Sequence, residues 1–187
     1  MSEWKLIRLG DICLINKNSY SSKDNWKFVN YLDTGSLTEN KITELQYINT
    51  KTDKMPSRAR RKVIKNSILY STVRPNQLHY GIIKEPVDNL LVSTGFTVID
   101  VDTNKAIPEF IYYLLIQNNT TDQLQAIAEQ SVSTYPSIKS SDIEDLEFKL
   151  PNLIIQNKIV SILDTIDSKI RQNEKINNNL EVFKKKY

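Results

Sequence analysis

Apolar residues in the first half of the chain occur in short runs rather than with helical spacing. In residues 1–50 such runs, for example at 28–32, are separated by long polar stretches at 16–25 and 34–41. Residues 51–102 carry β-branched and aromatic runs bounded by turn residues: Val63–Ile64, Ile68–Tyr70, Tyr80–Ile83 and Leu90–Val101. Runs of this length and composition are typical of strands. The pattern predicts a sheet, with long loops in its first part.

The spacing of apolar residues changes at Ala106 and becomes helical. Pro108 suits the first turn of a helix, and two apolar stripes follow, formed by Ile111, Leu114 and Leu115, then by Thr121, Leu124, Ile127 and Ala128. Residues 131–141 are polar and predict a loop. Leu146, Phe148 and Leu150 then alternate as in a strand, which gives two helices, a loop and a strand.

The C-terminal zone, residues 151–187, has the pattern of one long helix, without glycine or proline after Pro151. The apolar heptad positions are Ile159, Ile162, Ile166, Ile176, Leu180 and Phe183, interrupted by Lys169 and Asn173. At ~1.5 Å per residue the helix would be about 55 Å long. A narrow apolar seam predicts a coiled coil with a second helix, in which Asn173 would fix the register. The alternative is a terminal helix folded back on its own domain.

Composition describes an ordinary globular protein of 187 residues, 40% of them apolar, and predicts one domain with an appendage. The single cysteine, Cys13, excludes an internal disulfide and a cysteine zinc cluster, and a lone His79 cannot form a histidine-rich metal site. Beside Tyr80, that histidine is interpreted as a polar strand residue. No phosphate-binding glycine loop, signal peptide or long apolar span is found, so a cytoplasmic location is expected.

Charge is small in total, +3, but unevenly placed. Lys51–Arg74 contains eight basic residues and one acidic residue, whereas Glu85–Leu150 contains eleven acidic and three basic residues. Such segregation predicts one face that attracts polyanions and another that repels them. The alternative interpretation of the basic segment is a solvated loop and strand face.

Several segments, in the same order along the chain, resemble the target-recognition domain of the specificity subunit of type I restriction-modification enzymes. They are Trp4 with Leu9–Ile12, Pro56–Val63, Ile68–Asn76, Val92–Val98, Ser133–Ile138, and Leu150–Leu153 with Gln156 and Ile159. The chain departs from the family where it has Asn66-Ser67, Val132, Pro151-Asn152 and Ile155-Gln156. The usual subunit carries two recognition domains and two long helices, so this chain resembles half of one.

The resemblance implies an α+β fold: a curved mixed sheet with helices forms a target-recognition domain over residues 1–150, and a long coiled-coil helix over 151–187 serves dimerisation and methyltransferase-subunit binding. It implies a sequence-specific DNA-binding subunit without catalysis or cofactor of its own. The methyltransferase subunits would bind S-adenosylmethionine, and the restriction subunits ATP and Mg²⁺. The chain would pair with a second copy of itself or with a different half-subunit.

Candidate DNA-binding residues come from three segments. Arg60 or Arg61 is predicted to clamp a phosphate, and Arg58 to read a base, because guanidinium groups suit both tasks. The full candidate set is Lys51, Lys54, Ser57, Arg58, Arg60, Arg61, Lys62, Arg74, Asn76, Gln77, Ser133, Thr134, Tyr135 and Ser137. Arg74, Asn76 and Gln77 lie on one loop and suit guanine and adenine edges, so they are predicted base readers; ordinary turn chemistry is an equal alternative there. By resemblance, residues 17–25 are a variable DNA-facing surface.

Two other classes of function remain as alternatives. A metal-dependent nuclease would use Asp142, Glu147 and Lys149, but Phe148 between Leu146 and Leu150 favours a core strand there. A stand-alone repressor would need a helix-turn-helix, and no short helix rich in Arg, Gln and Asn follows a tight turn. Both rank below the specificity subunit.

Overall fold

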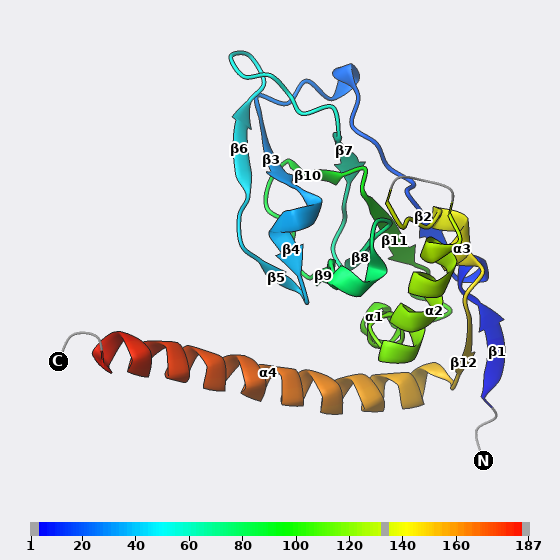
Figure 1. Ribbon diagram of the computed structural model, residues 1–187. Helices are drawn as coiled ribbons and strands as arrows, with labels where there is room; N and C mark the ends of the chain where they lie inside the picture. Colours follow the sequence, from blue (N-terminus) through cyan, green and yellow to red (C-terminus); the bar gives the residue numbers. More distant parts are fainter. Residues whose placement is uncertain (1–3, 132–134, 185–187) are drawn as a thin grey trace.

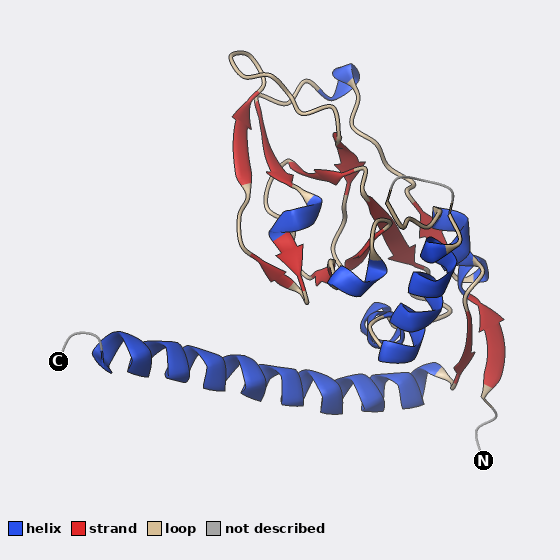
Figure 2. Ribbon diagram, in the orientation of Figure 1, coloured by secondary structure: helices blue, strands red, loops and turns tan. Residues whose placement is uncertain are grey.

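The computed structural model describes residues 4–131 and 135–184, which form a mixed α+β body flanked by one long helix (Figure 1). The expectation of an α+β fold with a mixed sheet is confirmed. The strands do not form one curved sheet, however: the described residues contain two four-stranded sheets and two small two-stranded ones (Figure 2).

The first four-stranded sheet has the order β6 (Gln46–Asn49), β3 (Phe28–Leu32), β10 (Leu90–Ser93) and β7 (Ala59–Lys62). Its β10–β3 pair is parallel and the other pairs are antiparallel. The edge strand β7 carries part of the basic segment.

The second four-stranded sheet is antiparallel, with the order β2 (Cys13–Ile15), β11 (Phe96–Val101), β8 (Ser67–Ser71) and β9 (Tyr80–Ile83). The run predicted over Leu90–Val101 is broken at the turn formed by Thr94 and Gly95. The chain therefore leaves the first sheet after β10 and enters the second at β11. An apolar cluster that contains Leu32, Leu69 and Phe96 joins the two sheets.

Short elements complete the body. Strands β4 (Leu37–Thr38) and β5 (Lys41–Ile42) form a hairpin, and β1 (Lys5–Arg8) pairs with β12 (Glu147–Leu150). Four 3₁₀ turns are η1 (Leu9–Asp11), η2 (Ser22–Asp24), η3 (Thr34–Ser36) and η4 (Pro75–Gln77). The alternation predicted for Leu146–Leu150 is confirmed by the buried side chains at both ends and half-buried Phe148.

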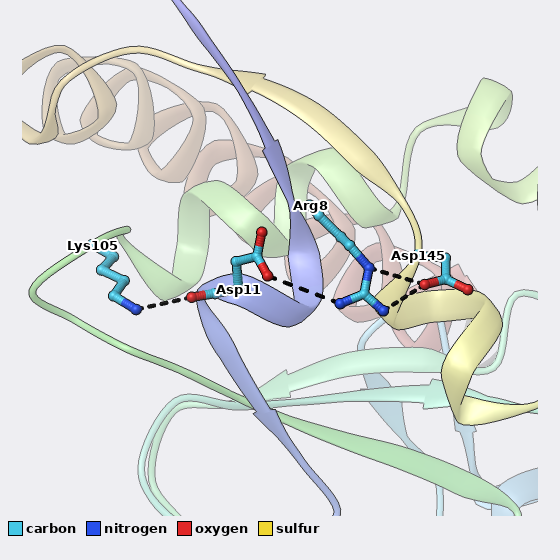
Figure 3. A network of polar contacts seen from close by, with 4 residues as sticks. All are labelled: Arg8, Asp11, Lys105 and Asp145. Atoms are coloured by element: carbon cyan, nitrogen blue, oxygen red, sulfur yellow. Dashed lines mark hydrogen bonds and ion pairs between the residues drawn. The ribbon is translucent and has the colours of Figure 1, made fainter.

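The segment after β1 is tied to distant parts of the body by polar contacts (Figure 3). The Arg8 guanidinium donates to Asp145 from Nε at 2.9 Å and also pairs with Asp11 at 3.9 Å, and Lys105 donates to the Asp11 carbonyl oxygen at 2.9 Å. The Arg8 and Asp145 side chains are exposed, so each ion pair contributes little alone. Together these contacts define where the first strand lies.

The two predicted helices are confirmed as α1 (Pro108–Leu115) and α2 (Asn118–Glu129), with Pro108 in the first turn of α1. The loop predicted over 131–141 is wrong at its end, because α3 (Ser140–Glu144) begins there. The Asp142 carboxylate accepts a 2.7 Å hydrogen bond from the Lys139 amide and so satisfies one of the free donors at the start of this helix. A helix of five residues is too short to show an apolar stripe in the sequence, so the pattern did not predict it.

The strand predicted at Val63–Ile64 is also wrong. These residues follow β7 and enter a tight turn, in which Ile64 donates its amide to the Ser67 hydroxyl at 2.9 Å and accepts the Ser67 amide at 3.1 Å. Asn66 has φ 65°, a left-handed conformation that asparagine adopts more readily than most residues. The turn therefore overrides the β propensity of the Val-Ile pair.

The long helix is confirmed as α4 (Leu153–Lys184), which runs along one flank of the body below α1 (Figure 1). At ~1.5 Å per residue, these 32 residues span about 48 Å. Gln156 and Val160 are buried, and Ile159, which the heptad placed in the seam, packs partly buried against the core of the body. Within the described residues, no helix combines the length and apolarity that a membrane span requires.

Candidate nucleic-acid interface

The fold divides the basic segment into separate sites. Lys51 and Lys54 are exposed in the loop between β6 and β7, at the end of the body farthest from α4 (Figure 1). Arg58 precedes β7, and its carbonyl oxygen accepts the Thr94 amide at 2.9 Å, which places it beside the turn between β10 and β11. These cations therefore reach different parts of the surface.

Strand β7 sends consecutive side chains to opposite faces, as alternation predicts for Arg60 and Arg61. Arg60 is exposed, and its Nε–H donates to the Ser57 carbonyl oxygen at 3.4 Å. Arg61 is half-buried, its Nε lacks a partner, and burial lowers the pKa of its guanidinium group. Of the two, only Arg60 presents its charge openly to a phosphate.

Lys62 is already engaged within the body. Its ammonium group pairs with Asp24 and lies 5.2 Å from the centre of the Trp26 ring. The Lys62 hydrogen bond is the main cause that lowers the pKa of the Asp24 carboxyl group. Lys62 thus anchors the 17–25 segment to β7, together with the backbone bonds of Tyr20 to Arg60 and of Lys62 to Asn18.

The η4 turn is bounded by two left-handed residues, Arg74 at φ 48° and Leu78 at φ 57°. Such a conformation is uncommon outside glycine and costs of order 1 kcal/mol or more, and strained residues of this kind cluster at functional sites. The Asn76 amide donates to the Gln125 Oε1 at 3.2 Å, which ties the turn to α2. The side chains of Asn76 and Gln77 are exposed.

Residues 135–137 lie against the η4 turn. The Arg74 amide donates to the Pro136 carbonyl oxygen at 2.9 Å, and the Arg74 guanidinium carbon lies 4.9 Å from the centre of the Tyr135 ring. Ser137 forms a bridge with Val73. Ser133 and Thr134 lie outside the described residues. The structure thus brings Arg74, Tyr135 and Ser137 together from two predicted DNA-binding segments.

A pocket of about 210 Å³ brings Arg58, from the segment before β7, next to Gln77 of the η4 turn. Its lining includes Arg58 and Gln77, which are predicted base readers from different segments, and also Thr34, Gly35, His79 and Gly95. The sequence did not single out Thr34 or His79 for this role, because Thr34 lies in η3 and His79 directly precedes β9. Only the pairing of distant strands brings them to Arg58.

The residues of the nuclease alternative are placed otherwise. The Asp142 carboxylate caps α3, whereas Glu147 and Lys149 are exposed on β12. In the described part of the chain, no group of three or more His, Cys, Asp or Glu side chains is arranged to hold a metal ion.

The architecture of body and flanking helix is that of specificity subunits. The crystal structure of the HsdS subunit from Thermoanaerobacter tengcongensis superposes with a TM-score of 0.78 at 25% identity, over 93% of this chain and 44% of that one. A structure that describes complex assembly and conformational transition of the type I R-M system gives a TM-score of 0.77 at 26% identity, with the same coverage.

Sequence comparison leads to the same family. The profile of the type I restriction modification DNA specificity domain matches residues 1–182, so the chain belongs to this family and the resemblance is confirmed. The type I restriction enzyme HindI specificity subunit of Haemophilus influenzae is 36% identical over 183 residues, which are 97% of this chain and 39% of that protein. The chain therefore spans about two fifths of the length of this relative. None of these matches is a nuclease or a repressor.

Proposed function

We propose that this chain recognises a specific sequence in duplex DNA, as one recognition half of a type I restriction-modification specificity subunit. The observation that carries the proposal is the convergence of Arg58, Arg74, Gln77 and Tyr135, from three segments far apart in sequence, onto neighbouring turns. Arginine and glutamine suit the acceptor and donor edges of guanine and adenine. A protein that acts on chromosomal DNA works where that DNA lies, so the proposal includes a cytoplasmic location.

The cations outside this group suit the phosphate backbone. Lys51, Lys54 and Arg60 are exposed, and cations that neutralise phosphates supply affinity without sequence preference. The proposed division is therefore between base readers at the turns and phosphate contacts on the β6–β7 loop and on β7.

Binding to duplexes selected from a random pool, measured over a range of salt concentrations, tests this division. Arg60→Ala should weaken binding to all sequences and lower the salt slope by about one unit. Arg58→Ala or Gln77→Ala should cost about 1–3 kcal/mol, mainly on the preferred sequence. Lys158→Ala, an exposed cation on α4, is the matched control. Unchanged binding by all three test variants would remove the proposed interface.

The proposal extends to partners. The relatives that this chain matches are specificity subunits of restriction enzymes, and one matched structure concerns assembly of the type I system. We therefore assign the chain a non-catalytic role that directs methyltransferase subunits, and through them restriction subunits, to DNA. The domain at 1–150 would read the DNA and the helix at 151–187 would serve assembly.

A second copy of the chain is the proposed partner of α4. The seam residues Ile162, Ile166, Ile176 and Leu180 are exposed, at 62%, 49%, 55% and 55% of their surface, and Ile170, which the heptad omitted, is exposed beside them. Lys169 and Asn173 are exposed as well, and the side chain of Phe183 lies outside the described residues. An exposed apolar seam, interrupted only at Lys169 and Asn173 after Ile159, favours a helix partner.

Light scattering after size-exclusion chromatography tests the pairing. The wild-type chain should give twice the mass of 21.7 kDa, and Ile176→Asp should give the monomer, with Lys175→Ala as the neighbouring control. Two identical chains would select two inverted half-sites around an unread spacer. A wild-type monomer at tens of micromolar would contradict the homodimer, and a selected site with unrelated halves would assign the chain to a pair with a different half-subunit.

A further inference from the structure

The pocket between η3, η4 and the β10–β11 turn holds polar groups whose hydrogen-bonding capacity is unused within the described structure. The Arg58 guanidinium and the Gln77 side-chain amide make no hydrogen bond there, and the Thr34 hydroxyl is buried without a partner. Buried polar groups in native proteins are nearly always satisfied, so an orphaned one requires an explanation. One such explanation is a bound molecule that supplies the missing hydrogen-bond partner.

His79 adds a group of defined polarity to the pocket. Its Nδ1 lies 2.7 Å from the Leu37 carbonyl oxygen and 3.0 Å from the Thr38 hydroxyl. A carbonyl oxygen only accepts, so Nδ1 must carry the proton, and in the neutral ring Nε2 then carries a lone pair. The fold thus specifies the tautomer in which the remaining ring nitrogen is an acceptor.

Two glycines line the pocket: Gly95 lets two of its walls approach each other closely, and Gly35 leaves space unfilled. A Cβ atom at Gly95 would lie 2.5 Å from the Thr34 hydroxyl, so only glycine lets the β10–β11 turn approach η3 this closely. At Gly35 a Cβ atom would meet nothing within 4 Å, and its φ is not in the left-handed region. A side chain at position 35 would therefore be tolerated by the backbone and would grow into open space at the pocket.

We propose that this pocket reads one base pair from the major groove, with His79 Nε2 accepting a hydrogen bond from the exocyclic amino group of adenine or cytosine and Arg58 donating to a neighbouring purine or carbonyl acceptor. The major groove displays such an amino donor next to acceptors at every base pair, and its position differs with the orientation of the pair. An acceptor in a pocket that is also lined by the donors of Arg58 and Gln77 can read that position. The inference rests on the proposed function and assigns a base-reading role to His79.

Selection from a random duplex pool gives the first test. The wild-type chain should prefer adenine or cytosine at one position, and His79→Phe should lose that preference by about tenfold while keeping all others, because one base contact of about 1.4 kcal/mol has gone. Gly35→Leu, which fills the pocket without disturbing Nδ1 of His79, should lose the same position. Lys175→Ala should lose none.

Duplexes with altered bases give the second test and separate the two amino groups. Replacing the preferred adenine by purine, or the preferred cytosine by pyrimidin-2-one, removes only the amino group. The wild-type chain should bind the matching altered duplex about tenfold more weakly than the unaltered one. The His79→Phe variant should bind the altered and unaltered duplexes equally, because it already lacks the contact to the amino group. Far-ultraviolet circular dichroism checks that each variant is folded, and Gly35→Leu carries the test if His79→Phe is not.

The outcomes distinguish the pocket from the function on which it rests. A wild-type chain that binds selectively, together with Gly35→Leu and His79→Phe variants of unchanged selectivity, would overturn the pocket alone. Indifference of the wild-type chain to both altered bases would do the same. A wild-type chain that binds no duplex, or all duplexes equally, would overturn the proposed function and the pocket together.

Discussion

The two ends of α4 meet different surroundings, although one helix and one apolar repeat include both. In the docked segment, residues 153–167, Gln156 and Val160 are buried, and the Tyr113 hydroxyl lies 2.9 and 2.8 Å from carboxylate oxygens of Asp164 and Asp167, which share its one proton. In the distal segment, residues 168–180, every side chain except Glu174 is exposed. Among the described residues, its one ion pair to the body joins Glu174 to Lys41 at 2.7 Å.

The difference shows that the body holds the first part of α4 by apolar packing of Ile159 and Val160 and by a few polar contacts, and that it leaves the later isoleucines exposed. Beyond Asp164 the helix no longer seals against the body, and two hollows of about 220 and 330 Å³ separate it from residues such as Tyr112 and Asn40. A helix with so little burial gains little stability from its own domain, because tertiary packing supplies most helical stability. On the proposed pairing, the distal segment would gain from a second helix the burial that its own body does not supply.

A charge placed on each face of the docked segment should separate the two surfaces most strongly. Val160 is 8% exposed and Ile162 is 62% exposed, two residues apart. Val160→Asp should lower the free energy of unfolding by about 3 kcal/mol or more, because it buries an unpaired carboxylate, and Ile162→Asp should change it by less than about 0.5 kcal/mol. Urea denaturation at a concentration where the chain is monomeric measures both. Equal losses would contradict docking of this face.

Removal of the Gln156 amide should have the next largest effect. Its Oε1 accepts the Ile107 amide at 2.9 Å and its Nε2 donates to the Pro151 carbonyl oxygen at 2.8 Å, so one side chain joins the starts of α1 and α4. Gln156→Leu keeps the volume and leaves both backbone groups without this partner, and should cost about 1–3 kcal/mol in the free energy of unfolding. Gln172→Leu in the distal segment is the exposed control and should leave the midpoint in urea unchanged.

Alkaline pH should weaken the docked segment with a smaller effect. Burial, and then the hydrogen bonds to Asp167 and Asp164, raise the pKa of Tyr113 above its ordinary value. The unfolded chain loses this proton near pH 10 whereas the folded chain keeps it, so the contribution is full below about pH 10 and is lost as the pH rises further. Tyr113→Phe should cost about 1 kcal/mol at neutral pH.

The same substitution should also make the decline of stability above pH 10 shallower. The pKa values of Tyr31 and Tyr112 are also raised by burial, so the comparison is the difference between the two chains rather than the slope of either one. Urea denaturation from about pH 8 to 11 measures the free energy of unfolding of both chains. If it declines in parallel for the two, Tyr113 does not hold the helix.

Periodic elements were predictable from the sequence, and turns were not. The stripe at Ile111, Leu114 and Leu115 and the long run after Pro151 set α1 and α4, because each helix has an apolar face that must be covered. The Val63–Ile64 pair and α3 failed because a serine hydroxyl and an aspartate carboxylate decide the local backbone there. Such side-chain bonds leave almost no periodic signal.

The candidate interface was predictable as a set of residue types but not as an arrangement. Arginine-rich composition pointed to Arg58 and Arg74. The sequence does not show, however, that Lys62 is paired with Asp24 and that Arg61 is half-buried in the body. His79 reaches Arg58 through the pairing of β8 with β9 and the passage of the chain from one sheet to the other. Contacts of this kind arise from topology, so no local pattern encodes them.

The unused hydrogen bonds of Arg58 and Gln77 also bear on how the chain can change over generations. Within the described residues, neither side chain supports a neighbour through a hydrogen bond, and both emerge from turns rather than from the apolar clusters. Exchange of such residues leaves the free energy of unfolding nearly untouched. On the base-reading role proposed for them, selection could alter the preferred DNA target at these positions without first acquiring a compensating mutation, so that specificity would diversify while the fold is inherited intact.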